Sequence, residues 1–241
     1  ANNPTINAFA TPGGVIVINS GLIRKTKTEA ELASVLAHEI AHVKARHLSR
    51  MHEESSKVNI STALSVLATV IAGTYSTGAL GKTLITGQSV KAAQLTNFIR
   101  EHEREADRLA INILVNANIN PKAMSDFFKT LQKENDDRGA LEFLRTHPLT
   151  ENRISETLSL ASKYKGNFTN DSFAYQFTSA KVSIEKINTK NFIKNYAYNA
   201  ELTKASPGRI VDDYAYGLAL IKEKKYKLGK EVLNDLLQIL S

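Results

Sequence analysis

The sequence predicts a mainly α-helical protein with a small β-sheet, an α+β fold, from three patterns. Apolar residues recur at helical spacing over two stretches, at about 28–50 and 100–114, and again after residue 155. A β-branched run at 15–18 lies between glycine and asparagine, which is typical of one short strand. With 241 residues and 42% hydrophobic content, the chain can build one substantial core and a smaller appended unit.

The first helical stretch begins with a capping box, because the Thr28 hydroxyl and the Glu31 carboxylate can satisfy free amides at a helix start. The apolar positions that follow predict one helix from about residue 28 to 50. On that helix His38 and His42 share a face, because residues four apart lie one above the other.

His38 and His42 can present two neutral ring nitrogens to one metal ion, with Glu39 beside the first of them. Zinc lowers the pKa of a bound water to about 7, and Glu39 would then act as the general base of a hydrolase. The alternative is a core histidine and a surface histidine that match the pattern by accident. The apolar helical context makes the full pattern much more specific than a lone histidine, and it favours the metal site.

A catalytic zinc usually has three protein ligands, so a third must lie elsewhere. Metzincins place glycine seven residues and histidine ten residues after the first histidine, but Ala45 and Leu48 occupy those positions. His47 is one residue out of register, which rejects that class. We expect His47, His52 and His102 to be surface or structural residues.

The second helical stretch places Glu103 and Asp107 on one face, with Glu101 and Glu105 pointing away from them. A carboxylate that binds the metal, followed by one that accepts the other ring N–H of a metal-bound histidine, is geometrically natural here. By composition alone, a solvated run of alternating charges is the alternative. The presence of the first motif favours a site.

Three ordered motifs in about residues 2–154 resemble the gluzincin peptidases related to HtpX, BepA, the CaaX prenyl proteases and the Oma-type proteases. The motifs are His38-Glu39-x-x-His42, Glu103-x-x-Ala106-Asp107 and His147-Pro148-Leu149-Thr150-Glu151-Asn152-Arg153. The resemblance implies a zincin-like catalytic domain at 1–165 with one zinc ion per chain. It also implies Glu103 as the third ligand and Asp107 as the residue that orients a ligand histidine.

The amino-terminal strand resembles the family strand that holds an extended peptide through backbone hydrogen bonds. That resemblance implies substrate contacts at Val15, Ile16 and Val17. Asn7 would position a substrate carbonyl, or it simply forms a turn.

His147 precedes Pro148, which favours a conformation outside a helix. In relatives this histidine approaches the metal, and it either caps the metal in a latent state or stabilises the oxyanion. The sequence leaves both roles open, with a surface loop histidine as the third alternative. Arg153 would stabilise the same substrate-binding region, or it would pair with acidic neighbours.

Residues 53–97 are expected to form a lid over the cleft. Within them, 58–81 contain no charged residue and are long enough for a bilayer span of about 20 residues, but they are rich in Ser and Thr. A lid helix is therefore favoured over a membrane-contacting patch. Residues 166–241 are expected to be a helical extension, either the start of a tetratricopeptide-like array or an ordinary helical hairpin.

Composition restricts the chemistry further. The absence of cysteine excludes thiolate metal sites and disulfides. The net charge is +7, but no nucleic-acid-binding motif accompanies it, so that class is set aside. The chain starts without methionine or an apolar leader, and we expect it to be a mature or trimmed form.

These patterns and the resemblance together predict a zinc-dependent endopeptidase. Its substrates would be unfolded or misassembled proteins of the bacterial cell envelope, in the periplasm, with contact to the membrane or the outer-membrane assembly machinery. The alternative is an envelope chaperone or interaction module with a latent metal site. The sequence does not indicate an oligomeric state.

Overall fold

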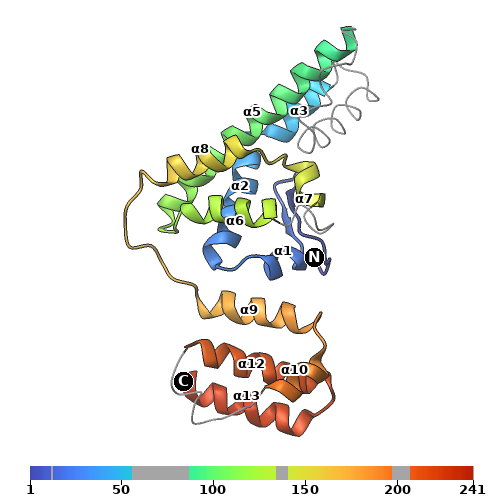
Figure 1. Cartoon of the computed structure of the whole chain (residues 1–241), viewed down its shortest axis with the longest axis vertical. Coiled ribbons are helices and arrows are strands. Elements are labelled where there is room, and N and C mark those ends of the chain that lie inside the picture. The colour runs from blue at the N-terminus through green and yellow to red at the C-terminus, as the bar shows by residue number, and fades with distance from the viewer. Residues whose placement is uncertain (12, 56–86, 134–140, 197–206, 241) are drawn as a thin grey trace. The chain divides into compact units, whose positions relative to one another are not determined.

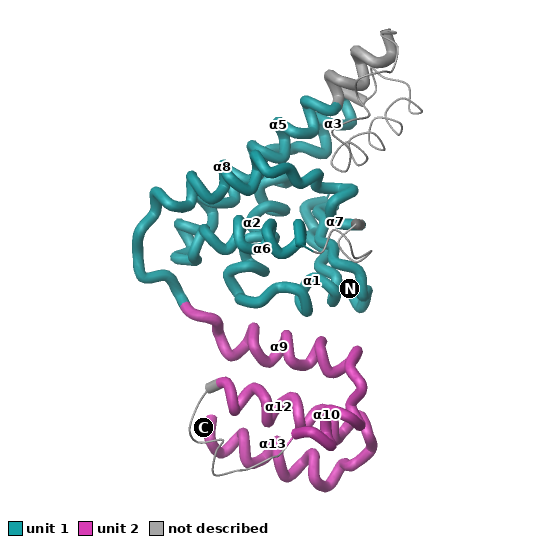
Figure 2. Tube along the Cα trace, in the orientation of Figure 1, with its two compact units in different colours: residues 1–169 teal, residues 170–241 magenta. Residues whose placement is uncertain are grey.

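The computed structural model describes residues 1–11, 13–55, 87–133, 141–196 and 207–240 (Figure 1). The chain divides into two compact units, residues 1–169 and 170–241 (Figure 2). The predicted fold class is confirmed, because the described elements are mainly helices with a small antiparallel sheet. The predicted boundary at residue 165 lies close to the end of the first unit.

The first unit begins with a two-stranded sheet. Strands β1 (Ala8–Ala10) and β2 (Ile16–Ile18) pair antiparallel, with Phe9 opposite Val17. Six described helices follow in the same unit: α1 (Ser20–Lys25), α2 (Glu29–Lys44), α3 (His47–Ser55), α5 (Gly87–Asn116), α6 (Lys122–Lys133) and α7 (Leu141–Thr146). The unit ends with α8 (Glu151–Ala161).

The capping box at the start of α2 forms in a slightly shifted version. The Thr28 hydroxyl accepts from the Glu31 amide at 3.1 Å, while the Glu31 carboxylate accepts from the Lys27 amide at 2.6 Å. The single helix predicted for 28–50 is wrong, because α2 ends at Lys44 and a second helix starts at His47. Arg46 makes the break with φ of 56°, a left-handed conformation that usually costs a non-glycine residue about 1–2 kcal/mol.

Helix α2 lies at the centre of the first unit, where it packs against α5, α6 and β1 (Figure 1). The core beside it is aliphatic and aromatic, and its almost completely buried side chains include Leu22, Ile111, Leu114 and Phe127. Burial of each such side chain contributes about 1.5–3 kcal/mol. This core fixes α2 against α5, the two helices that carry the predicted metal ligands.

Gly21 fixes the amino-terminal segment against α1. Its amide donates to the Asn3 carbonyl at 2.9 Å, and a Cβ at this position would lie 2.1 Å from the Pro4 carbonyl oxygen. Only glycine allows this approach of the two backbones. The segment that leads into β1 is therefore held closely by the beginning of α1.

The second unit consists, in its described part, of α9 (Phe173–Ile184), α10 (Thr189–Asn195), α12 (Pro207–Lys222) and α13 (Tyr226–Leu240). Helices α12 and α13 pack closely, because a Cβ on Gly217 would lie 2.7 Å from Cδ2 of Leu233. Tyr216, Leu220 and Val232 form the core between them. A tetratricopeptide-like array and an ordinary helical hairpin both remain compatible with this pair.

The predicted lid at 53–97 falls largely on residues 56–86, which lie outside the described part of the chain. Its last residues, from Gly87 onward, belong to α5. The lid and membrane-patch alternatives for 58–81 therefore both stay predictions. Among the described residues, no helix combines the length and the apolar character needed to cross a bilayer.

Candidate metal centre

Four side chains from distant parts of the first unit meet at one point. His38 and His42 come from α2, Glu103 comes from α5, and His147 lies between α7 and α8. One ligand atom from each of the four lies within 4.8 Å of the others. The structure therefore brings the three predicted ligands together and adds His147 as a fourth donor.

The distances between these donors suit one small metal ion. Nε2 of His38 lies 2.9 Å from Nε2 of His42 and 3.4 Å from Oε2 of Glu103. Oε1 of Glu103 lies 3.3 Å from Nε2 of His42. Ligand atoms at about 2.0–2.1 Å from a tetrahedral zinc are about 3.3 Å apart, and two imidazoles with one carboxylate are a known catalytic zinc set. The residues present fit zinc.

The outer nitrogen of His38 faces a buried ion pair. Nδ1 of His38 lies 3.0 Å from Oδ1 of Asp107. Arg153 holds that carboxylate with two contacts, Nε to Oδ2 at 2.7 Å and Nη2 to Oδ1 at 2.8 Å. Nη1 of Arg153 lies 2.8 Å from Oε2 of Glu103 and donates to the Pro148 carbonyl at 2.8 Å. One guanidinium thus connects the candidate ligand Glu103, the carboxylate of Asp107 that faces His38, and the His147-Pro148 loop.

The outer nitrogen of His42 faces a different group. Nδ1 of His42 lies 2.9 Å from Nδ1 of His47, and Nε2 of His47 lies 3.1 Å from Oε2 of Glu105. Arg50 on α3 donates to the same carboxylate oxygen at 2.9 Å. Glu105 therefore points away from Glu103, as the helical spacing predicts, and contacts α3.

Glu39 and His147 contact each other beside the candidate ligands. Nε2 of His147 is 3.3 Å from Oε1 of Glu39, while its Nδ1 is 3.3 Å from Nε2 of His38 and from both oxygens of Glu103. Glu39 is 1% exposed and His147 is 7% exposed. The imidazole of His147 thus occupies the space between the candidate base and the candidate ligands.

Burial and the neighbouring charges shift the pKa values in this cluster in opposite directions. Burial lowers the pKa of His42 to about 3, and the charge of His38 acts in the same direction. Burial also opposes charge on His38, but its contacts with Asp107 and Glu103 outweigh burial and raise its pKa to about 10. His38, which lies beside two carboxylates, thus favours its charged form, whereas His42 favours its neutral form.

The carboxylates of the cluster are held in their ionised form. Burial would raise the pKa of Glu103, but the charges of His147 and Arg153 hold it well below its usual range. Burial opposes ionisation of Asp107 as well, and the Arg153 guanidinium holds its pKa below the usual value. Burial opposes the charge of Arg153, but the same two carboxylates outweigh burial and raise its pKa, so all three groups stay charged.

The residues predicted to touch substrate lie in several environments. Val15 is exposed, whereas Ile16 and Val17 are half-buried in β2, whose second edge has no strand partner among the described residues. Asn7 is buried just before β1, and its Nδ2 donates to Oε1 of Glu142 at 3.4 Å. Arg153 is buried with its guanidinium bound to protein carboxylates. Roles of these residues toward substrate stay predictions.

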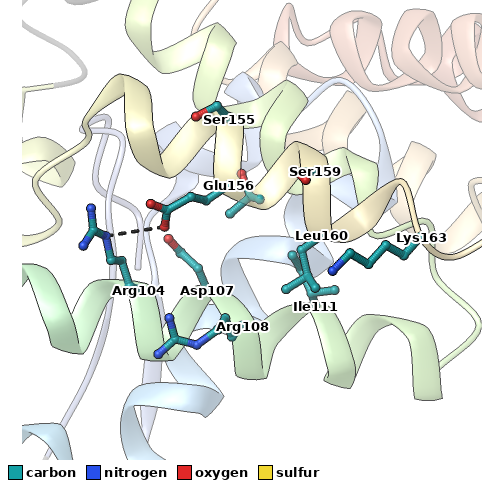
Figure 3. A pocket seen from close by; sticks show the side chains of 10 residues that line it. Arg104, Asp107, Arg108, Ile111, Ser155, Glu156, Ser159, Leu160 and Lys163 are labelled. Carbon is teal, nitrogen blue, oxygen red and sulfur yellow. Dashed lines mark ion pairs between the residues drawn. The ribbon is translucent and has the colours of Figure 1, made fainter.

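A pocket of about 480 Å³ lies between α5 and α8 (Figure 3). Three cationic side chains line it, Arg104, Arg108 and Lys163, and Nε of Arg104 lies 3.4 Å from Oε2 of Glu156. Asp107 reaches the pocket, but its lining includes none of the four donors described above. The pocket is therefore separate from the four donors of the candidate metal centre.

Sequence reasoning missed the contact of His47 with a candidate ligand. His47 and His102 are buried, in agreement with a structural role, while His52 is exposed. In the sequence, only the spacing of five residues between His42 and His47 bears on this contact. In an unbroken helix that spacing would place His47 away from the face that carries His38 and His42. The break at Arg46 changes the direction of the chain and brings His47 back to His42.

Comparison with known proteins agrees with this geometry. A beta-barrel assembly-enhancing protease of Yersinia pestis is 36% identical over 245 residues, which cover 98% of this chain and 49% of the relative. The protein of the same name from Escherichia coli K12 is 31% identical over 242 residues, with the same two coverages. The mitochondrial metalloendopeptidase OMA1 of Schizosaccharomyces pombe is 32% identical over 154 residues, covering 63% of this chain and 42% of the relative.

The chain spans about half the length of the first two relatives. The names of the first two relatives describe proteases, and the name of the third describes a metalloendopeptidase. The model of peptidase family M48 matches residues 1–161, the part that contains every donor of the metal centre. This chain belongs to peptidase family M48.

Proposed function

We propose that this protein is a zinc-dependent endopeptidase, with zinc held by His38, His42 and Glu103. The observation that supports it best is the donor set, whose separations of 2.9–3.4 Å lie close to the edge of a zinc tetrahedron, about 3.3 Å. When bound, zinc supplies a Lewis acid that polarises the scissile carbonyl and acidifies the attacking water. Glu39, outside the ligand set, takes the proton of that water and passes it to the leaving amine.

The ligands are oriented before the metal arrives. Nδ1 of His38 lies 3.0 Å from Oδ1 of Asp107, and Arg153 holds that carboxylate in place, so the proton that His38 gives up when metal binds is the one on its inner nitrogen. Burial keeps His42 neutral, the form that binds metal.

Removal of the metal tests the proposal directly. A chelator will abolish cleavage of casein, an unfolded polypeptide, and one equivalent of zinc per chain will restore it, while magnesium will not, because it prefers oxygen ligands. Metal content and casein fragments are measured on the same samples. Cleavage that survives full removal of the metal would contradict a metalloendopeptidase. A chain that binds zinc yet never cleaves would support the interaction-module alternative.

His147 is proposed to cap the metal in the conformation seen here. Its Nδ1 completes a four-donor set with His38, His42 and Glu103, and a catalytic zinc needs one of its four positions free for water. The ring also lies against Glu39, where the attacking water has to be. Departure of His147 would therefore precede catalysis.

Replacement of His147 by alanine separates the two roles that the sequence left open. Loss of a cap raises casein cleavage by the ratio of capped to open protein, about tenfold for a cap worth about 1.4 kcal/mol. Loss of an oxyanion-stabilising group instead lowers cleavage by about 10²–10³-fold. We expect the gain. His52→Ala, at an exposed position on α3, is the matched control, and zinc content should stay at one ion per chain in both variants.

The substrates are proposed to be unfolded or misassembled polypeptides of the bacterial cell envelope. The names of the Yersinia pestis and Escherichia coli relatives, which refer to β-barrel assembly, support this proposal. A periplasmic location and contact with the membrane or the outer-membrane assembly machinery follow from the same likeness. The edge of β2 that has no partner strand in the described part of the chain offers backbone groups with which an extended substrate segment could pair.

A further inference from the structure

His47 is the first residue of α3 and is only 3% exposed. No sequence motif explains why a histidine is buried at this position. His47 lies in a continuous chain of contacts that starts at a candidate metal ligand. The first contact joins Nδ1 of His42 to Nδ1 of His47 at 2.9 Å. The second joins Nε2 of His47 to Oε2 of Glu105 at 3.1 Å. Arg50 completes the chain at 2.9 Å from the same oxygen of Glu105.

The direction of each hydrogen bond in this chain follows from its two ends. Nε2 of His42 faces the other donors, so in a neutral ring the proton must be on Nδ1 and the lone pair on Nε2. That Nδ1–H then donates to Nδ1 of His47. A neutral His47 carries its own proton on Nε2 and donates it to Glu105, a carboxylate that only accepts. The carboxylate thus determines the tautomers of both imidazoles.

Packing holds the ring of His47 in the orientation that this chain requires. It stacks on the ring of His102, with centroids 4.2 Å apart and an angle of 11° between planes. His102 in turn contacts Phe98, with centroids 4.0 Å apart. The left-handed residue Arg46 turns the backbone so that α3 runs beside α5, which brings His47 between His42 and Glu105.

We propose that His47 is a positioning residue of the metal centre: it accepts the Nδ1–H of His42 and holds that ring in the tautomer and orientation that bind zinc. It would do for His42 what Asp107 does for His38, but with an imidazole between the ligand and the carboxylate. This inference rests on the proposed function, because it requires zinc at His42. Loss of such a partner typically weakens metal binding by about 10–100-fold.

Two substitutions at residue 47 test the acceptor at the Nδ1 position. His47→Phe keeps a flat ring that can stack on His102 but accepts no hydrogen bond. His47→Asn loses the ring but places an amide oxygen near the former Nδ1, where it can accept from His42. The zinc dissociation constant is measured by competition with a chromogenic chelator, and the visible spectrum of the cobalt(II)-substituted protein reports the ligand geometry.

We expect His47→Phe to raise the zinc dissociation constant about 10–100-fold and to change the cobalt spectrum, and His47→Asn to restore most of both. Thermal unfolding of the metal-free proteins shows whether each variant is folded. If His47→Phe does not fold, His47→Gln replaces it, because its amide reaches the former Nε2 position and Glu105 but not His42.

The outcomes are distinguishable. Wild-type affinity and an unchanged spectrum in folded His47→Phe or His47→Gln would overturn the role of His47 and leave the proposed zinc site intact. Equal weakening in folded His47→Asn and His47→Phe would overturn the acceptor role. A wild-type protein that binds no zinc would overturn the proposed function, and this inference with it.

Discussion

Glu39→Gln lowers the casein-cleavage rate by about 10²–10⁴-fold, the usual contribution of a general acid–base group. The side-chain amide has nearly the shape of the carboxylate, but it cannot take a proton from the attacking water. Glu39 is almost completely buried and lies outside the group of metal-binding donors, so zinc content should not change. The measurement is kcat and KM on casein, with metal content determined for the same preparations.

The background of this experiment matters because His147 lies 3.3 Å from Glu39. The Glu39→Gln substitution is therefore compared with its parent protein both with and without His147→Ala, so that a capped site does not hide the effect. Glu101→Gln, an exposed position on α5, makes the same change of charge and should leave cleavage unchanged. Wild-type cleavage by zinc-loaded Glu39→Gln would show that another group is the base.

Arg153→Met destabilises the protein by about 3–5 kcal/mol, the usual result of breaking a buried ion pair from one side. Methionine fills much of the space beside Phe128, but it removes the guanidinium that binds the buried carboxylates of Glu103 and Asp107. Urea unfolding measures the effect as a lower midpoint with an unchanged slope.

The stability difference between wild type and Arg153→Met should become smaller in acid, and the direction of this pH dependence follows from the pKa shifts. Arg153 lowers the pKa of both carboxylates in the folded protein, so their contribution to wild-type stability is present above their unfolded pKa values, about 3.9 and 4.3. That contribution disappears as the pH falls through the lowered folded values. In the variant, protonation removes the unpaired charges instead, so the two stability curves approach each other below about pH 5.

Two further variants control for side-chain size and charge. Arg153→Lys keeps the charge but loses the planar fork that binds two carboxylates, and it should lie between wild type and Arg153→Met. Arg108→Met, an exposed position on α5, should change stability by less than about 0.5 kcal/mol. A loss below about 1 kcal/mol for Arg153→Met would mean that the carboxylates find another partner or are neutral.

The parts of the site that could be predicted from the sequence are those in which one helix sets the geometry. His38 and His42 share a face of α2, and Glu103 and Asp107 share a face of α5, because residues four apart in a helix always do. The packing of α2 against α5 then brings the two pairs together. Spacing within helices and one resemblance were enough to select these four residues.

The rest depends on contacts that no local pattern encodes. Arg153 meets Asp107 across 46 positions of sequence, so its choice of partner appears only when α5 and the start of α8 are in place. The end of α2 was missed because the alanine-rich pattern continues past Lys44, and no glycine or proline indicates the left-handed turn at Arg46. The position of His47 follows from that turn.

The burial of the metal centre also determines which ions suit it. Three carboxylates and one guanidinium are enclosed there, from Glu39, Glu103, Asp107 and Arg153, and their formal charges sum to −2 when the histidines are neutral, the form that binds metal. A dication makes the enclosed group electrically neutral, whereas a monovalent or trivalent ion leaves an excess charge in a medium of low polarity. The buried charges thus favour a divalent ion over a monovalent or trivalent one. A protein that has lost its metal can recover part of this balance by holding a proton on His38.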